Sequence, residues 1–250
     1  MIVRGDAFHL PFPDRTFDII VADPPYDIGK NKAGRGKRGI SVRPYVGFKS
    51  RAWWAEAWRV LNDTGRLYVV CAVQELDPWI RTVPVRYSDL LAWHAPNAVS
   101  IAAKYAKAQG RRAYTWRPII EWTKPGAGPL QNPDGLCHGN SLSHSLISYP
   151  AHESLPWPNQ LPLAVATWLL APIPGSLVLD LFAGTGTTRV AAEGLGLTAV
   201  SVELAPEAIA INQQRPAPLT LPRRPFQLPT PNITLDDLYP VRRKPPCPTR

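Results

Sequence analysis

The tetrapeptide Asp23-Pro24-Pro25-Tyr26 constrains this chain more than any other part of its sequence. It follows an apolar run over residues 17–22, which predicts a buried strand of a parallel sheet. The two prolines end such a strand and stiffen the turn, because proline has no N–H for the ladder. We therefore expect an acid, a rigid carbonyl and an aromatic ring at the carboxyl end of a strand, where open α/β sheets bind ligands.

A glycine-rich segment near the other end of the chain carries the second informative pattern. Residues 176–181 predict another buried strand, and the segment Phe-Ala-Gly-Thr-Gly-Thr-Thr at 182–188 leads from it into a predicted helix. This arrangement brings backbone close to a nucleotide-like ligand. A third predicted strand, 198–202, ends in Glu203, nineteen residues after Gly184. That spacing suits a carboxylate that accepts both ribose hydroxyls of an adenosine-containing cofactor.

The same glycine loop is also compatible with a dinucleotide-dependent oxidoreductase. In that class, however, the pattern is Gly-x-Gly-x-x-Gly, and Arg189 stands where the third glycine belongs. Nothing in NAD chemistry calls for the Asp-Pro-Pro-Tyr tetrapeptide. These two differences disfavour an NAD enzyme.

Together, the tetrapeptide and the Phe-Ala-Gly-Thr-Gly loop resemble the amino-group DNA methyltransferases, which methylate adenine N6 or cytosine N4 with S-adenosylmethionine. The catalytic motif precedes the cofactor loop, which resembles the circularly permuted β group. Further segments are similar to family segments: Gly5-Asp6-Ala7 and residues 65–70, 118–124 and 157–162. The resemblance covers residues 1–215 and implies an α/β, Rossmann-like methyltransferase fold, with a mostly parallel, doubly wound sheet and helices on both faces.

The resemblance implies a role for each motif residue. Asp23 and the Pro24 carbonyl would accept the two N–H bonds of the target amine, Pro25 would keep the turn rigid, and Tyr26 would stack on the base. The residues that it places around the cofactor are Asp6, Ala7, Gln160, Asp180, Phe182, Gly184, Gly186, Thr187 and Glu203. The target base must be flipped out of a duplex or already single-stranded. We expect adenine N6, because cytosine enzymes more often have serine at the position of Asp23; cytosine N4 stays open.

Two positions depart from the family pattern. Trp157 replaces the usual histidine, and Leu161 replaces the usual lysine, which removes a cation near the expected cofactor pocket. An inactive nucleic-acid-binding protein that keeps the fold therefore stays open beside the active methyltransferase.

The formal net charge of +9 favours a polyanionic partner, with DNA expected and RNA open. Residues 27–50, directly after the tetrapeptide, are rich in glycine and basic residues and cannot pack a core. The cations that we expect to contact phosphates there are Lys30, Lys32, Arg35, Lys37 and Arg38. The alternative is a solvated, mobile loop.

We expect one methyltransferase domain over residues 1–215. Residues 94–150 are a candidate target-recognition insert, with a surface helix as an equally good interpretation, and 216–250 are a proline-rich, disordered tail. Because little chain is free for recognition, we expect a short target or loose specificity. A homodimer and a cognate restriction enzyme stay open as partners. Residues 51–61 predict a helix whose tryptophans we expect in the core: Trp53, Trp54 and Trp58.

Other classes of protein are disfavoured. The longest apolar stretch is broken by prolines, glycine and an acid, and the start lacks a signal-peptide core, so we expect a cytoplasmic protein without a membrane span. The three cysteines suggest no disulfide framework. Cys137, His138, His144 and His152 share one region but lack a Cys-x-x-Cys pair, so we expect no metal.

Overall fold

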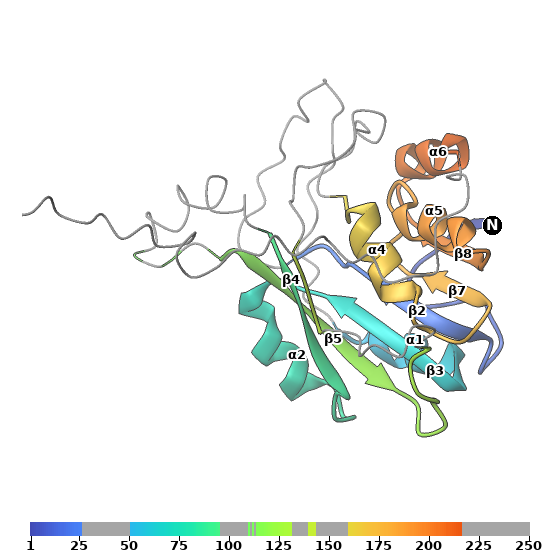
Figure 1. Cartoon of the computed structure of the whole chain (residues 1–250). Coiled ribbons are helices and arrows are strands. Elements are labelled where there is room, and N and C mark those ends of the chain that lie inside the picture. Colours follow the sequence, from blue (N-terminus) through green and yellow to red (C-terminus); the bar gives the residue numbers. More distant parts are fainter. Residues whose placement is uncertain are drawn as a thin grey trace, which may run out of the picture.

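An eight-stranded sheet forms the centre of the protein, with helices on both faces (Figure 1). The computed structural model describes residues 1–26, 51–95, 110, 112, 114–131, 140–143 and 160–216. The strands are Ile2–Arg4 (β1), Phe17–Ala22 (β2), Leu61–Val70 (β3), Asp89–His94 (β4), Trp116–Thr123 (β5), Ser141–Ser143 (β6), Leu177–Asp180 (β7) and Thr198–Glu203 (β8). Across the sheet they follow the order β1-β8-β7-β2-β3-β5-β4-β6. The strands predicted at residues 17–22, 176–181 and 198–202 are confirmed as β2, β7 and β8.

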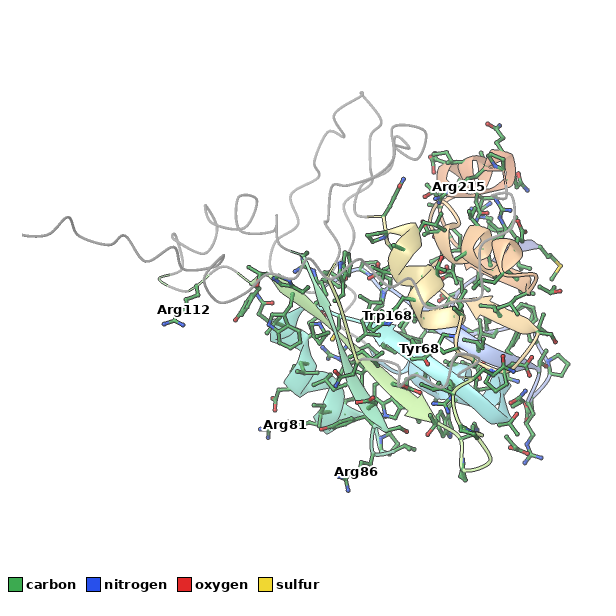
Figure 2. All side chains as sticks on the ribbon, viewed as in Figure 1. Tyr68, Arg81, Arg86, Arg112, Trp168 and Arg215 are labelled. Atoms are coloured by element: carbon green, nitrogen blue, oxygen red, sulfur yellow. The ribbon has the colours of Figure 1, made fainter. Side chains whose placement is uncertain are left out.

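Helices pack on both faces of the sheet. They are Trp53–Val60 (α1), Leu76–Thr82 (α2), Leu163–Leu170 (α4), Thr187–Gly194 (α5) and Pro206–Gln214 (α6), with a 3-10 turn at Val73–Glu75 (η1). Helices α4 and α5 pack on one face, α1 and α2 pack on the other, and α6 contacts β1 and β8. Figure 2 shows Tyr68 of β3 and Trp168 of α4 in the layer between sheet and helix. Among the described residues, no helix has the length and apolar character needed to cross a bilayer.

The central strand β2 is buried on both faces. Its residues Ile19, Ile20, Val21 and Ala22 are at most 1% exposed. Successive side chains of a strand point to opposite faces, so Ile19 and Val21 join the apolar layer beneath α4 whereas Ile20 and Ala22 join the layer beneath α1. A strand of this kind needs a continuous apolar run, which is why the sequence pattern located it correctly.

Strand directions divide the sheet into two parts. The strands β1, β8, β7, β2 and β3 are parallel, whereas β5 is antiparallel to β3 and β4 is antiparallel to β5. The mostly parallel, doubly wound sheet expected from the resemblance is thus confirmed. The beginning of β5 consequently lies at the edge where the parallel strands end. Strands β5 and β6 belong to the candidate recognition insert at 94–150, so part of that segment contributes to the central sheet.

The boundary between α1 and β3 differs from the sequence prediction. The predicted helix at 51–61 is α1, which ends at Val60, and the chain passes directly into β3 at Leu61 instead of residue 65. Leu61 is fully buried and pairs with Phe17 of β2, so tertiary pairing extends the strand toward the helix. Core packing is confirmed for Trp53 and Trp54, which are buried, whereas Trp58 is half-buried and stacks on Trp54.

Candidate active site

Three carboxylates lie at the ends of neighbouring parallel strands. Asp23 follows β2, Asp180 ends β7 and Glu203 ends β8, and these strands are adjacent in the order β8-β7-β2. Asp180 pairs with Val21 of β2 and with Ser201 of β8, so the three strands end together. The structure therefore brings the tetrapeptide and the glycine loop to one edge of the sheet, although they are far apart in the sequence.

Asp23 is half-buried and titrates unusually. Burial is the main reason that its pKa rises from 3.8 to about 7, and the nearby carboxyls of Asp180 and Glu75 raise it further. The Tyr26 hydroxyl donates a hydrogen bond of 2.9 Å to Asp23 Oδ1, which lowers the pKa, as does the positive charge of Arg117. The carboxyl group therefore changes its charge near neutral pH, and above that range it is a strong hydrogen-bond acceptor.

Asp180 is buried at the beginning of the glycine loop. Its burial raises its pKa from 3.8 to about 6, and the negative charge of Glu203 raises the pKa further. Two hydrogen bonds oppose this effect, one from Thr188 and one from the backbone N–H of Phe182 to Asp180 Oδ1 at 3.1 Å. Asp180 thus fixes the first turn after β7.

Two glycines shape the turn between β7 and α5. Gly184 has a φ of 47° and Gly186 a φ of 83°, both in the left-handed region that favours glycine. Helix α5 begins directly after Gly186, whose carbonyl accepts the N–H of Val190 at 3.0 Å. A Cβ on Gly186 would lie only 2.3 Å from Oδ1 of Asn212 in α6. The fold itself therefore requires glycine at 186, and Thr187, the first residue of α5, is buried behind it.

Glu203 connects the glycine loop to the segment before α6. Its Oε2 accepts the N–H of Gly184 at 2.7 Å, and its Oε1 accepts the N–H groups of Leu204 and Ala205, each at 2.8 Å. A carboxylate has about four acceptor positions, and these three bonds leave one of them, on Oε2, open for a ribose hydroxyl. The half-buried carboxylate beside a glycine loop therefore fits an adenosine-containing cofactor.

The segment 5–7 lies beside the end of β8. The N–H of Gly5 donates to the carbonyl of Glu203 at 3.1 Å. Asp6 Oδ1 accepts the N–H of Phe8 at 3.1 Å, and Ala7 is 3% exposed. The two predicted adenine contacts, Asp6 and Ala7, are thus placed next to the predicted ribose contact.

Two tryptophans that the sequence did not assign to the site support Phe182 and the glycine loop. The ring of Phe182 meets Trp53 of α1 edge-on, with ring centroids 5.1 Å apart. Trp53 in turn meets Trp79 of α2 edge-on at 5.2 Å. Each tryptophan buries a large area and Trp53 is fully buried, so the loop rests on a rigid base. No local signal links Trp53 to the loop, because the two are more than a hundred residues apart.

Residues 160 and 161 lead into α4. Gln160 is half-buried, and Leu161 is 7% exposed and packs in the apolar layer between α4 and the sheet. A leucine at this position therefore contributes to the core, which is the structural consequence of its departure from the family's lysine. The predicted residues that lie outside the described part of the chain are Lys30, Lys32, Arg35, Lys37, Arg38, Trp157, Cys137, His138, His144 and His152.

Arg189, which occupies the position of the third fingerprint glycine, contacts α6. Its Nε donates to Asn212 Oδ1 at 2.7 Å, and its Nη2 donates to the Arg215 carbonyl at 2.6 Å. Its Nη1 forms an ion pair with Glu193 at 2.6 Å. Arg189 therefore joins α5 to the end of α6.

Over the ranges that the structure describes, no three potential metal ligands lie together.

Arg117, near the beginning of β5, is a further charged residue that sequence reasoning missed. Its guanidinium carbon lies 6.0 Å from the centroid of the Tyr26 ring. The available signal was a cation beside the apolar strand pattern at 118–122, which by itself did not indicate where the side chain would lie.

Comparisons with known proteins agree with this geometry. The Type II methyltransferase M.HpaI of Haemophilus parainfluenzae is 21% identical over 217 residues, which cover 81% of this chain and 68% of the relative. The DNA adenine methyltransferase YhdJ of Escherichia coli K12 is 24% identical over 250 residues, covering 86% and 81%. The crystal structure of the M1.HpyAVI–SAM complex has a TM-score of 0.60 at 20% identity, covering 85% of this chain and 98% of that one.

A family model extends over most of the chain. The model of the N6/N4 methyltransferases, described as DNA methylase, matches residues 17–214. This range begins with β2 and ends in α6, so it includes both the tetrapeptide and the glycine loop. The chain belongs to the N6/N4 DNA methylase family.

Proposed function

We propose that this protein transfers a methyl group from S-adenosylmethionine to an exocyclic amine of a base in DNA, with adenine N6 as the preferred target. The observation that carries the proposal is the shared sheet edge, where Asp23 and the glycine loop lie at the ends of adjacent strands β2 and β7. The family membership supports the reaction class, and it sets aside the NAD-dependent oxidoreductase.

Asp23 is proposed to act on the target amine. The lone pair of an exocyclic amine is delocalised into the base ring, so the nitrogen is a poor nucleophile. Asp23 and the Pro24 carbonyl would accept its two N–H bonds, which orients the nitrogen and favours its change toward sp³ geometry. These acceptors stabilise the positive charge that develops on the nitrogen in the transition state, where such stabilisation is most effective. Pro25 keeps the carbonyl in place, and Tyr26 offers a stacking face.

The glycine loop and Glu203 are proposed to hold the cofactor. Gly184 and Gly186 let the backbone approach it, Glu203 binds its ribose, and Asp6 and Ala7 contact its adenine. The remaining expected contacts are Gln160, Asp180, Phe182 and Thr187. When bound, S-adenosylmethionine supplies an electrophilic methyl group on a sulfonium centre. The neighbouring ends of β7 and β2 support a single site for this group and the target amine, in which orientation would contribute much of the rate enhancement.

Substitution of Asp23 tests this proposal. We expect Asp23→Ala to bind S-adenosylmethionine with nearly unchanged affinity, measured by calorimetry, because Asp23 contacts the target amine. Methyl transfer to DNA, measured with radiolabelled cofactor, should fall about 10³-fold or more. As a comparison, Glu203→Gln should weaken cofactor binding. Unchanged turnover in Asp23→Ala would reject the role of Asp23. If the unmodified protein binds DNA but does not bind S-adenosylmethionine, the result would favour an inactive protein that keeps the fold.

The modified nucleoside identifies the substrate. After incubation with DNA or RNA, digestion and mass spectrometry distinguish N6-methyladenine from N4-methylcytosine. We expect N6-methyladenine in DNA, at a short or loosely defined sequence. A cytosine product would correct the base, and a product only in RNA would correct the nucleic acid, while both would keep the reaction class.

DNA is the partner that follows from this function. The basic segment at 27–50 is proposed to contact its phosphates, and weaker DNA binding at higher salt would support that role. A second copy of the chain and a cognate restriction enzyme stay open as partners. Analytical ultracentrifugation decides the former, because a homodimer would sediment with twice the mass of one chain.

A further inference from the structure

Arg117 reaches the active site through the antiparallel part of the sheet. Because β5 is antiparallel to β3, its first residues lie at the edge where β2 and β3 end. The N–H of Cys71, the residue after β3, donates to the Pro118 carbonyl at 3.1 Å and extends this pairing by one residue. Arg117 therefore lies beside the tetrapeptide, on the side away from β7 and β8 and their cofactor-binding segments.

The side chain of Arg117 faces Tyr26. Its guanidinium carbon is 6.0 Å from the ring centroid, at the outer limit of a cation–π contact. Within the described part of the chain, Arg117 forms a long hydrogen bond, 3.5 Å from Nη1 to the Trp116 carbonyl. A guanidinium has five N–H donors, so this half-buried group has donors left for other contacts at the site.

Charges around Asp23 are predominantly negative. The acidic groups that act on it are Asp180 at the end of β7 and Glu75 in η1. The neutral but titratable groups beside it are Tyr26, which donates to it, and the buried thiol of Cys71. Burial raises the pKa of Tyr26, as it does that of Asp23, and the positive charge of Arg117 acts on both groups and opposes these increases.

We infer that Arg117 is a positioning residue of the methyl-transfer site: it lies beside Tyr26, whose hydroxyl donates to Asp23, and there it holds Tyr26 for stacking and favours the ionised, hydrogen-bond-accepting form of Asp23. This inference rests on the proposed function and deepens it. An ionised Asp23 accepts N–H bonds from the target amine more strongly than a protonated one, which would itself be a donor. Arg117 thereby widens the pH range in which the site can act.

The test compares the pH profiles of kcat/KM for Arg117→Met, Arg117→Lys and the unmodified protein. This profile reports groups of the free enzyme. We expect the acid limb of Arg117→Met to move up by about one pH unit, so activity at pH 6.5 falls about 10-fold and largely recovers at pH 9. Arg117→Lys keeps the charge and should move less. Arg86 is exposed and projects away from the protein (Figure 2), so Arg86→Met serves as the matched control and should keep the original profile.

Two further readouts separate positioning from general damage. Cofactor affinity of Arg117→Met should stay the same, because Arg117 lies on the other side of Asp23 from the glycine loop. An equal loss at every pH, or an unshifted acid limb in both Arg117 variants, would overturn the inference. If instead the unmodified protein transfers no methyl group, or Asp23→Ala is fully active, the proposed function fails. The two failures are therefore distinguishable.

Discussion

At the scale of residues, two acids of the candidate site lower the stability of the folded state when they are ionised. Asp23 and Asp180 are acids whose pKa values rise to about 7 and about 6, chiefly because burial disfavours their charged forms. An acid whose pKa is higher in the folded state than in the unfolded state makes the folded state less stable whenever it is ionised. The same burial strengthens the hydrogen bonds that Asp23 can accept from a target amine. Such a conflict is typical of functional positions.

We expect Asp23→Asn to stabilise the fold at alkaline pH. Between pH 4 and pH 7 the folded chain holds a proton on Asp23 more readily than the unfolded chain does, so this residue lowers stability progressively as the pH rises through that window. Asparagine removes the charge and keeps an oxygen that can accept from Tyr26. The variant should gain on the order of 1 kcal/mol at pH 8 and almost nothing at pH 4.5. Urea unfolding at both pH values measures this, and an equal gain at the two values would contradict it.

At the scale of elements, the turn between β7 and α5 depends on backbone geometry. The loop must reverse direction within a few residues, bring N–H groups to the site and start a helix. Gly186 does this at a φ of 83° with Asn212 directly behind it. On one side of the turn, Glu203 accepts the N–H of Gly184. On the other side, the ring of Phe182 packs against Trp53. A substitution that strains the backbone at Gly186 should therefore affect both stability and cofactor binding.

A pair of alanine substitutions separates the cost of backbone strain at a positive φ from the cost of a collision between the new Cβ and a neighbouring side chain. Gly186 and Gly196 both have positive φ, but a Cβ at Gly196 meets nothing within 4 Å. We expect Gly196→Ala to cost about 1 kcal/mol through backbone strain alone. Gly186→Ala should cost about 3 kcal/mol or more, because the Cβ also collides with Asn212, and it should weaken cofactor binding. Chemical denaturation and calorimetry provide the measurements, and equal costs at both positions would show that Asn212 simply moves aside.

At the scale of the whole molecule, the contact between β3 and β5 joins the parallel part of the sheet to the antiparallel part. Arg66 of β3 forms a buried ion pair with Glu121 of β5, and its Nη2 donates to the Gly128 carbonyl. Burial raises the pKa of Glu121, and Arg66 lowers it. Because β5 also positions Arg117, this junction connects the core to the active site.

Removing only the arginine of this ion pair should lower the free energy of unfolding more than removing both charges. Arg66→Met leaves a buried carboxylate without its cation, and we expect a loss of about 3 kcal/mol in the free energy of unfolding. Adding Glu121→Gln removes that charge and keeps an acceptor, so the double variant should recover most of the loss. Guanidinium unfolding of the single and double variants measures the coupling. Two losses that simply add would show that the pair contributes nothing beyond its separate residues.

Several elements could be located from local signals in the amino-acid sequence. Continuous apolar runs identified β2, β7 and β8, prolines marked the end of β2, and glycines marked the turn into α5, because burial on both faces and positive φ each restrict which residues can stand there. The tetrapeptide and the glycine loop indicated the family through their resemblance to its motifs. Tertiary structure alone decided that Arg117 faces Tyr26, that Trp53 supports Phe182, that Leu161 joins the core and that β3 begins at Leu61. Each of these depends on pairing and burial between segments distant in the chain, which local residue preferences do not encode.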